Sequence, residues 1–62
     1  MKVREVIGLL EEDGWTVHST RGSHRQFKHP TKPGRVTVPG KPREDLHPKT
    51  QASILRQAAL RP

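Results

Sequence analysis

The spacing of hydrophobic residues changes at Asp13–Gly14, and this change limits the possible folds more than any other feature of the sequence. Before it, hydrophobic residues recur every three or four positions, as on one face of a helix: Val3, Val6, Ile7 and Leu10. After it, hydrophobic and polar residues alternate, which is typical of a half-buried strand. We therefore expect a helix over residues 2–13, ended by Gly14 in a left-handed conformation, and strands beyond it.

Three segments with a period of two follow the predicted helix. The first begins at Trp15, the second covers residues 24–29, and the third is "RVTVP" at residues 35–39. Alternation assigns one set of side chains to the core: Trp15, Val17, Phe27, Val36 and Val38. The short connections between the segments predict an antiparallel meander.

One hairpin loop sets the expected pairing of the first two strands. We expect residues 20–22 to form a three-residue loop with its glycine in the left-handed conformation. This register puts Trp15 opposite Phe27, as a cross-strand aromatic pair. It also puts His18 opposite His24 on the other face of the sheet.

A second helix is predicted near the end of the chain. Pro48 suits a first helical turn, where its missing N–H is not needed. Ile54, Leu55 and Ala58 supply an apolar face. Leu46 is the apolar residue of the charged, proline-rich loop before it. The order helix, three strands, helix predicts an α+β fold with both helices on one face of a three-stranded antiparallel sheet. We expect residues 1–62 to form a single domain.

The sheet face away from the helices is predicted to be polar and basic. The side chains assigned to it are Thr16, His18, Thr20, His24, Gln26, Lys28, Arg35 and Thr37. None of them is a carboxylate, and the whole chain has 12 Lys and Arg against 6 Asp and Glu, a net charge of +6. A basic surface of this kind favours binding to nucleic acid. The alternatives are a charge that serves solubility, or docking to an acidic protein.

The composition limits the chemistry that the chain can support. Only 29% of the 62 residues are hydrophobic, and a chain this short has a small core, so we expect a surface site and no cofactor. The absence of cysteine excludes thiolate catalysis and cysteine zinc sites. No apolar run approaches the roughly 18 residues of a membrane span, and no signal peptide is recognised. We expect a cytoplasmic protein that does not act on membranes.

His24 is the candidate catalytic residue among the 4 histidines. It follows Gly22–Ser23 at the start of a predicted strand, on the basic face. Histidine changes its protonation near neutral pH. Beside RNA, it can take the proton of a ribose 2′-OH or give a proton to the 5′-oxygen leaving group. The alternative is a loop histidine that contacts backbone.

The other histidines have different predicted roles. His18 could assist catalysis if the expected register holds. His29 is expected to be structural, and His47 to cap the second helix or to contact phosphate. No close-spaced pair such as H-E-x-x-H occurs, so we expect no metal site.

Basic residues near His24 and before the second helix are candidate RNA contacts. Cations bind phosphate and stabilise the charge that builds on it during cleavage. The candidate RNA-binding residues are Arg21, Ser23, Arg25, Lys28, Arg35, Lys41 and Lys49. Contacts of this type would position the RNA backbone without reading its sequence.

Four segments are specific as a set, although each alone would be weak. They are "LLEEDGW", "RGSHRQFKHP", "RVTVPG" and "SILRQAAL", and together they run from the first predicted helix to Leu60. In order and spacing they resemble the HicA toxin family, also called the YcfA-like family. The resemblance implies a double-stranded-RNA-binding-domain-like fold. It also implies the activity of a ribosome-independent mRNA interferase, the endoribonuclease toxin of a type II toxin–antitoxin pair.

The resemblance further implies a catalytic residue and partners. The family's catalytic histidine, in its Gly-Ser-His element, corresponds to His24. The implied partners are mRNA and a HicB-type antitoxin that covers the active face, with operator DNA bound only through the antitoxin. Gly40 stands where many relatives have a histidine, and Lys49–Thr50 stands where the family usually has Gly-Thr. His18 is not part of the family's pattern, so we expect a mechanism with one histidine.

Two other functions are compatible with the sequence. A non-catalytic RNA-binding module of the same fold would use His24 only to contact a phosphate. A protein-interaction domain would use its charge for an acidic partner, and its RNA binding would depend weakly on salt. No motif specifies a cleavage preference or an oligomeric state.

Overall fold

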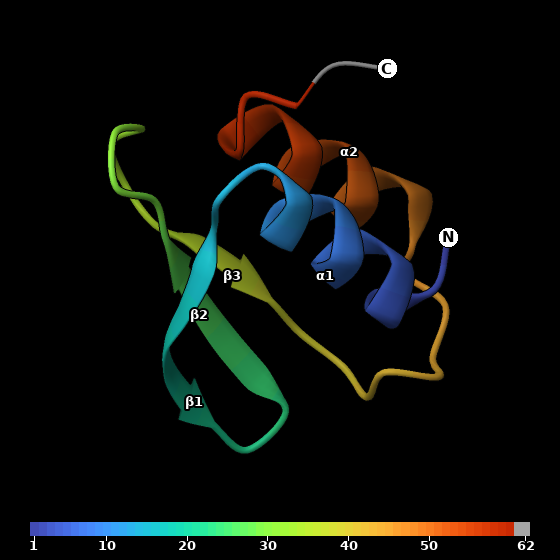
Figure 1. Ribbon diagram of the computed structural model, residues 1–62. Helices are drawn as coiled ribbons and strands as arrows, with labels where there is room; N and C mark the ends of the chain where they lie inside the picture. The colour runs from blue at the N-terminus through green and yellow to red at the C-terminus, as the bar shows by residue number, and fades with distance from the viewer. Residues whose placement is uncertain (61–62) are drawn as a thin grey trace.

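Two helices pack on one side of a three-stranded sheet in the computed structural model, which describes residues 1–60 (Figure 1). In chain order the elements are α1 (Val3–Glu12), β1 (Thr16–Arg21), β2 (His24–Lys28), β3 (Val36–Val38) and α2 (Pro48–Gln57). The sheet is antiparallel, with the strand order β1-β2-β3. The predicted α+β fold and its order of elements are confirmed.

Helix α1 begins and ends within one residue of its predicted bounds. At its start, the Val3 N–H donates to the Glu44 carbonyl oxygen at 2.8 Å, and the Arg4 N–H donates to that of Pro42 at 3.0 Å. The loop before α2 therefore supplies acceptors that the first turn of a helix lacks. At its end, Gly14 has a φ of +104°. Glycine tolerates this conformation better than other residues, which confirms the predicted stop.

The core lies between the sheet and the two helices. Its buried residues are Val3, Val6, Leu10, Trp15, Phe27, Val36, Val38, Leu46, Ile54 and Ala58. Of the residues predicted to face inward, Trp15, Phe27, Val36 and Val38 are buried in this core, as predicted. Val17 is the exception: it is 49% exposed, and all the other residues of β1 are exposed as well.

The loop between β1 and β2 is one residue shorter than predicted. It consists of Gly22 and Ser23, and the Cα partners that flank it are Arg21 and His24. Gly22 has a φ of +60°, whereas Ser23 has no positive φ. This is the pattern of a type II′ hairpin turn, which takes glycine at its first position. The predicted three-residue loop is wrong, and so is the predicted pairing of His18 with His24.

A β-bulge interrupts β1 and shifts the register further. Val17 lies opposite Phe27 and Ser19 opposite Gln26, so the residue between them has no partner on β2. The predicted pairing of Trp15 with Phe27 is therefore wrong. Since the bulge adds one residue, it also changes which β1 side chains share a face with which β2 side chains. Ser19 and Arg21, rather than Thr20, oppose residues on the face away from the helices.

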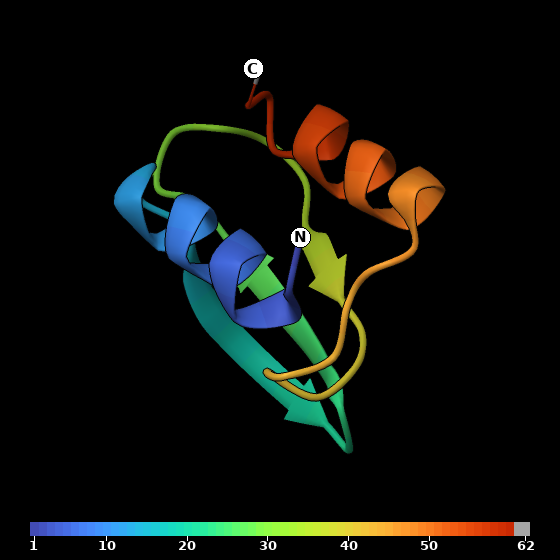
Figure 2. The same ribbon diagram turned by 90° about the vertical axis from the view of Figure 1, so that its right-hand side faces the viewer.

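Helix α1 lies over the side of the sheet near β1, and α2 lies beside β3 (Figure 2). The ends of the two helices are joined through Lys32 in the loop between β2 and β3. Its ammonium group forms a salt bridge with Asp13 after α1, and its Nζ donates to the Ala58 carbonyl oxygen after α2 at 3.1 Å. The helices thus cover one face of the sheet and leave the other open to solvent.

Candidate active site

We define the outer face as the sheet face away from the helices. Its strand residues are Thr16, Ser19, Arg21, His24, Gln26, Lys28 and Thr37. Alternation along β2 fixes the position of His24 on it, because Phe27, three residues further on, is fully buried on the opposite face. The His24 side chain is exposed. Unlike the rings of His29 and His47, which hydrogen-bond backbone, its imidazole has no hydrogen-bond partner within residues 1–60.

Two hollows meet at His24. The first, of ≈ 710 Å³, lies over the outer face and is lined by Ser19, Thr20, Arg21, His24, Gln26 and Thr37. The second, of ≈ 440 Å³, lies between β3 and α2. Besides His24, Thr37 and Ile54, it is lined by Pro39 and by a row of polar α2 side chains: Lys49, Thr50, Ser53 and Gln57. A ligand that reaches His24 across the outer face can therefore continue along α2.

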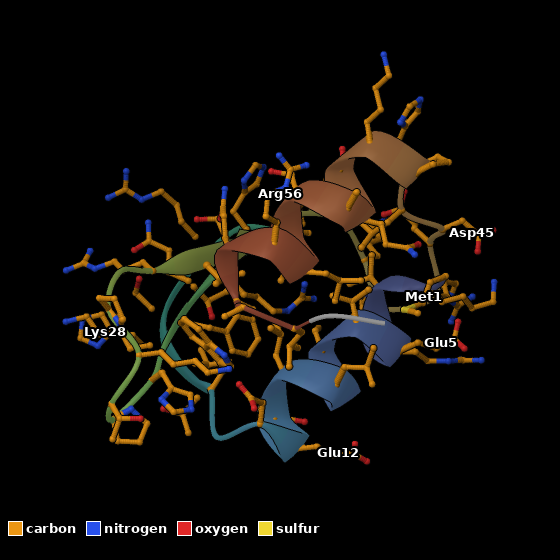
Figure 3. All side chains as sticks on the ribbon, turned by 90° about the horizontal axis from the view of Figure 1, so that it is seen from above. Met1, Glu5, Glu12, Lys28, Asp45 and Arg56 are labelled. Carbon is orange, nitrogen blue, oxygen red and sulfur yellow. The ribbon has the colours of Figure 1, made fainter. Side chains whose placement is uncertain are left out.

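The outer face is free of acidic residues. The segment 16–38, which contains all three strands, has no Asp or Glu. The carboxylates are instead on α1, at its end and at residues 44–45. Figure 3 shows Glu5 and Glu12 on α1, on the side of the molecule away from Lys28. A phosphodiester that approaches the outer face would thus meet cations and no carboxylate.

Several predicted RNA contacts lie on or beside this face. Arg21 is directly opposite His24 and lines the first hollow, and Ser23 is in the turn between them. Lys28 is exposed at the far end of β2. The Arg35 guanidinium group lies beside Gln26 of the outer face, where its Nη1 donates to the Gln26 Oε1 at 3.2 Å.

Three other predicted RNA contacts have different positions. Arg25 shares the inner face with Val38, and its Nη1 donates to the carbonyl oxygen of Gly40 at 2.9 Å. This hydrogen bond therefore links the start of β2 to the loop after β3. Lys41 belongs to the loop that covers the start of α1 and lines neither hollow. Lys49, at the start of α2, lines the second hollow.

The His29 ring holds the loop after β2 in place, as predicted for a structural histidine. Its Nδ1 accepts hydrogen bonds from the N–H groups of Thr31 and Lys32 at 3.1 and 3.0 Å. Because Nδ1 accepts, the ring proton is on Nε2, which donates to the Asp13 carbonyl oxygen at 2.6 Å. The ring also meets Trp15 edge-on, with centroids 5.2 Å apart. Both ring nitrogens of His29 are therefore used in hydrogen bonds within the fold.

Asp13 is the acidic member of the same cluster. Its carboxylate pairs with the Lys32 ammonium group and accepts from the Trp15 Nε1 at 3.2 Å. The bond to Lys32 above all holds the pKa of Asp13 below its ordinary value. This charge is thus neutralised inside the fold, on the side of the sheet away from His24.

The two remaining histidines differ in role. The His47 Nδ1 accepts from the Lys49 N–H at 3.1 Å at the start of α2, which confirms the predicted cap. His18 is the unpaired residue of the β1 bulge. It lines a third hollow with Thr16 and Lys28, away from His24.

The polar row on α2 was not among the predicted site residues, apart from Lys49. Thr50, Ser53 and Gln57 are spaced three or four positions apart, so they follow one side of the helix next to Ile54. This spacing is visible in the sequence. That the row faces His24 is not, because it depends on how α2 packs beside β3.

Residues 1–60 contain neither a cluster of metal ligands nor a membrane-spanning helix. No group of three His, Asp or Glu side chains there is arranged to hold a metal ion. No helix in this part of the chain is long and apolar enough to cross a membrane.

Comparison with known proteins identifies the family. A search of curated proteins found no match. A family model described as "HicA toxin of bacterial toxin-antitoxin" matches residues 3–60. The matched region contains both helices and all three strands, including the hairpin that carries His24. Because the match covers nearly the whole chain, this protein belongs to the HicA toxin family of bacterial toxin–antitoxin systems.

Proposed function

We propose that the protein is an endoribonuclease, the mRNA-cleaving toxin of a type II toxin–antitoxin system, with His24 as its general acid or base. One observation carries the proposal: His24 is exposed where two hollows meet, on a sheet face without carboxylates. An imidazole without internal hydrogen bonds is available for proton transfer. Membership of the HicA family supports the toxin role.

The proposed reaction uses the 2′-hydroxyl of the RNA itself. As general base, His24 takes the proton of a ribose 2′-OH, and the 2′-oxygen forms a bond to the adjacent phosphorus. The bond from phosphorus to the 5′-oxygen breaks, and this oxygen takes up a proton from a water molecule. The products are a 2′,3′-cyclic phosphate and a 5′-hydroxyl end. If His24 acts instead as the acid, it gives the proton to the 5′-oxygen, and a water molecule takes the proton of the 2′-OH. Either role is worth roughly 10²–10⁴-fold in rate.

Arg21 would stabilise the reacting phosphate. It is directly opposite His24 and lines the same hollow. A guanidinium group can make two parallel hydrogen bonds to phosphate oxygens, and negative charge builds on these oxygens during the reaction. Lys28 and Arg35 continue the basic surface and would hold the neighbouring backbone.

The outer face would also bind the antitoxin. The family implies an antitoxin partner, and a surface with Arg21, Lys28 and Arg35 and no carboxylate would attract an acidic one. We propose a HicB-type antitoxin that covers His24 and so excludes mRNA. Operator DNA would be bound through the antitoxin.

Cleavage of single-stranded RNA in the presence of EDTA tests the proposed function. We expect the purified protein to cut without added metal and to leave 2′,3′-cyclic phosphate and 5′-hydroxyl ends. An RNA of the same sequence with 2′-O-methyl riboses should stay intact, because its 2′-oxygen carries no proton to remove. A requirement for a divalent cation, or products with 3′-hydroxyl and 5′-phosphate ends, would contradict the proposed reaction.

The same preparation distinguishes the two alternative functions. A non-catalytic RNA-binding module would bind the RNA with a steep salt dependence and leave it intact. A domain that docks to an acidic protein would bind RNA with a weak salt dependence, since few phosphates would be contacted.

A further inference from the structure

The two largest aromatic side chains cannot stack on RNA bases. Trp15 and Phe27 are both 0% exposed, and the chain has no Tyr. Proteins that read single-stranded RNA combine aromatic stacking with hydrogen bonds to the base edges. Stacking on His24 or Arg21 would accept any base, so discrimination between bases near His24 rests mainly on hydrogen-bonding side chains.

The first hollow is better suited to phosphate than to a base. Arg21 lines it, and a guanidinium group binds phosphate in any sequence. Its one carboxamide, Gln26, already accepts a hydrogen bond from Arg35 through Oε1. This hollow therefore offers a cation for phosphate and the hydroxyl groups of Ser19, Thr20 and Thr37, but no carboxamide with a free acceptor.

The second hollow presents hydrogen-bonding groups that are nearly free. The row on α2 contains two hydroxyl groups and one carboxamide, from Thr50, Ser53 and Gln57. The hydrogen bond of the Gln57 Nε2 to the Ser53 Oγ is 3.5 Å long, beyond the usual range. A carboxamide offers a donor and an acceptor side by side, which matches the edge of a base.

The size and position of the second hollow also suit one nucleotide. Its ≈ 440 Å³ falls within the range of about 300–1,000 Å³ for small-ligand sites. His24 lines it as well as the first hollow. A nucleotide bound in it would thus be next to the phosphate at His24. Lys49 at its end could bind that nucleotide's other phosphate, and Pro39 offers an apolar surface.

We propose that the hollow between β3 and α2 is the base-recognition subsite of the enzyme. In it, Gln57 and Ser53 hydrogen-bond the base of the nucleotide next to the scissile phosphate. The proposal rests on the proposed RNA cleavage and adds to it the residues that set its sequence preference. These two side chains position and select the RNA, whereas His24 moves the proton.

Cleavage of a randomised single-stranded RNA, with sequencing of the product ends, tests the subsite. Wild-type protein should prefer one base at a position next to the cut. Gln57→Ala should weaken this preference roughly tenfold, because a base edge loses its hydrogen-bonding partner. Ser53→Ala should weaken it less. In both variants, the cleavage rate summed over all RNA sequences should fall far less than in His24→Ala.

A matched control is available on the same helix. Gln51 lines an apolar hollow with Met1 and Leu55, away from His24. Gln51→Ala removes the same chemical group from α2 and should leave the base preference unchanged. Gln57→Glu keeps the size of the side chain but removes its donor, and it should change which base is preferred.

The outcomes separate the subsite from the proposed function. If wild-type protein cuts all sequences equally, or if Gln57→Ala and Ser53→Ala keep its base preference, the subsite is wrong and the nuclease stands. An equal loss of preference in Gln51→Ala would also overturn the subsite, because the effect would belong to the helix as a whole. If the wild-type protein does not cleave RNA, the proposed function fails and the subsite fails with it.

Discussion

His29 and His24 are 5 positions apart in the sequence, but their rings have opposite environments. His29 donates through Nε2 to the Asp13 carbonyl oxygen and accepts through Nδ1 from the N–H groups of Thr31 and Lys32. The His24 ring is exposed on the outer face. Within residues 1–60, the His29 ring thus stabilises the fold, whereas the exposed His24 is the residue to which we assign proton exchange with RNA.

His29→Ala should lower the free energy of unfolding by about 2–4 kcal/mol. The substitution leaves the N–H groups of Thr31 and Lys32 and the carbonyl of Asp13 without their partner, and it removes the edge contact to Trp15. Urea denaturation measures the change.

His18→Ala is the matched control, because His18 is exposed at the bulge of an edge strand. It should change the stability by no more than about 0.5 kcal/mol. A His29→Ala protein as stable as His18→Ala would show that the ring does not hold the loop.

At the scale of elements, alanine substitutions at Gly8 within α1 and at Gly14 just after it should change the free energy of unfolding in opposite directions. Gly8 is inside the helix, and an added Cβ would meet nothing within 4 Å. Gly8→Ala should raise the free energy of unfolding by about 0.5–1 kcal/mol. Gly14 has a φ of +104°, and its Cβ would lie 3.0 Å from the His29 Nε2. Gly14→Ala should lower it by more than about 1 kcal/mol.

Thermal unfolding of the two variants measures these effects in parallel. Relative to the wild type, the midpoint temperature of unfolding should be higher for Gly8→Ala and lower for Gly14→Ala. A midpoint for Gly14→Ala at or above that of the wild type would contradict the role assigned to this glycine as the stop of α1.

The end of α1 and the start of α2 could be predicted because single residues mark them. Gly14 and Pro48 each suit one position of a helix end, and His47 can cap the next turn. The register of β1 could not be predicted. Val17 is the one hydrophobic residue of "TVHSTR", and both faces of this edge strand are exposed. Where neither face is buried, the hydrophobic pattern does not specify the pairing.

The candidate site was only partly predictable for a similar reason. Phe27 must be buried, so alternation along β2 places His24 on the outer face whatever the pairing of β1. The inner position of Arg25 follows from the same alternation, but its bond to Gly40 depends on a loop that has no regular pattern. The polar row on α2 becomes part of the site only through the packing of that helix beside β3.

At the scale of the whole molecule, Asp13 and Lys32 join the ends of both helices to the loop between β2 and β3. Because the pKa of Asp13 is lower in the folded chain, the folded state binds its proton less tightly than the unfolded state. The stability that this carboxylate contributes is full above the ordinary pKa of Asp, about 4. It is lost as the pH falls through the lower pKa of the folded state.

Asp13→Asn should therefore be less stable than the wild type at neutral pH. The difference in unfolding free energy between the two proteins should shrink as the pH falls below about 4 and through the lower pKa of the folded wild-type carboxylate. Urea denaturation at a series of pH values measures it. A difference that stays constant across this range would show that the charge of Asp13 does not contribute.

The central claim is that His24 performs proton chemistry on RNA that is held across the outer face. The most direct test compares wild-type and His24→Ala proteins in two assays with EDTA: single-turnover cleavage of an RNA, and binding of its uncleavable 2′-O-methyl form. Since acid–base catalysis is worth roughly 10²–10⁴-fold, the cleavage rate should fall by about 100-fold or more. Binding should change little, because phosphate contacts such as Arg21 remain. A His24→Ala protein that cleaves RNA as fast as the wild type would contradict the claim.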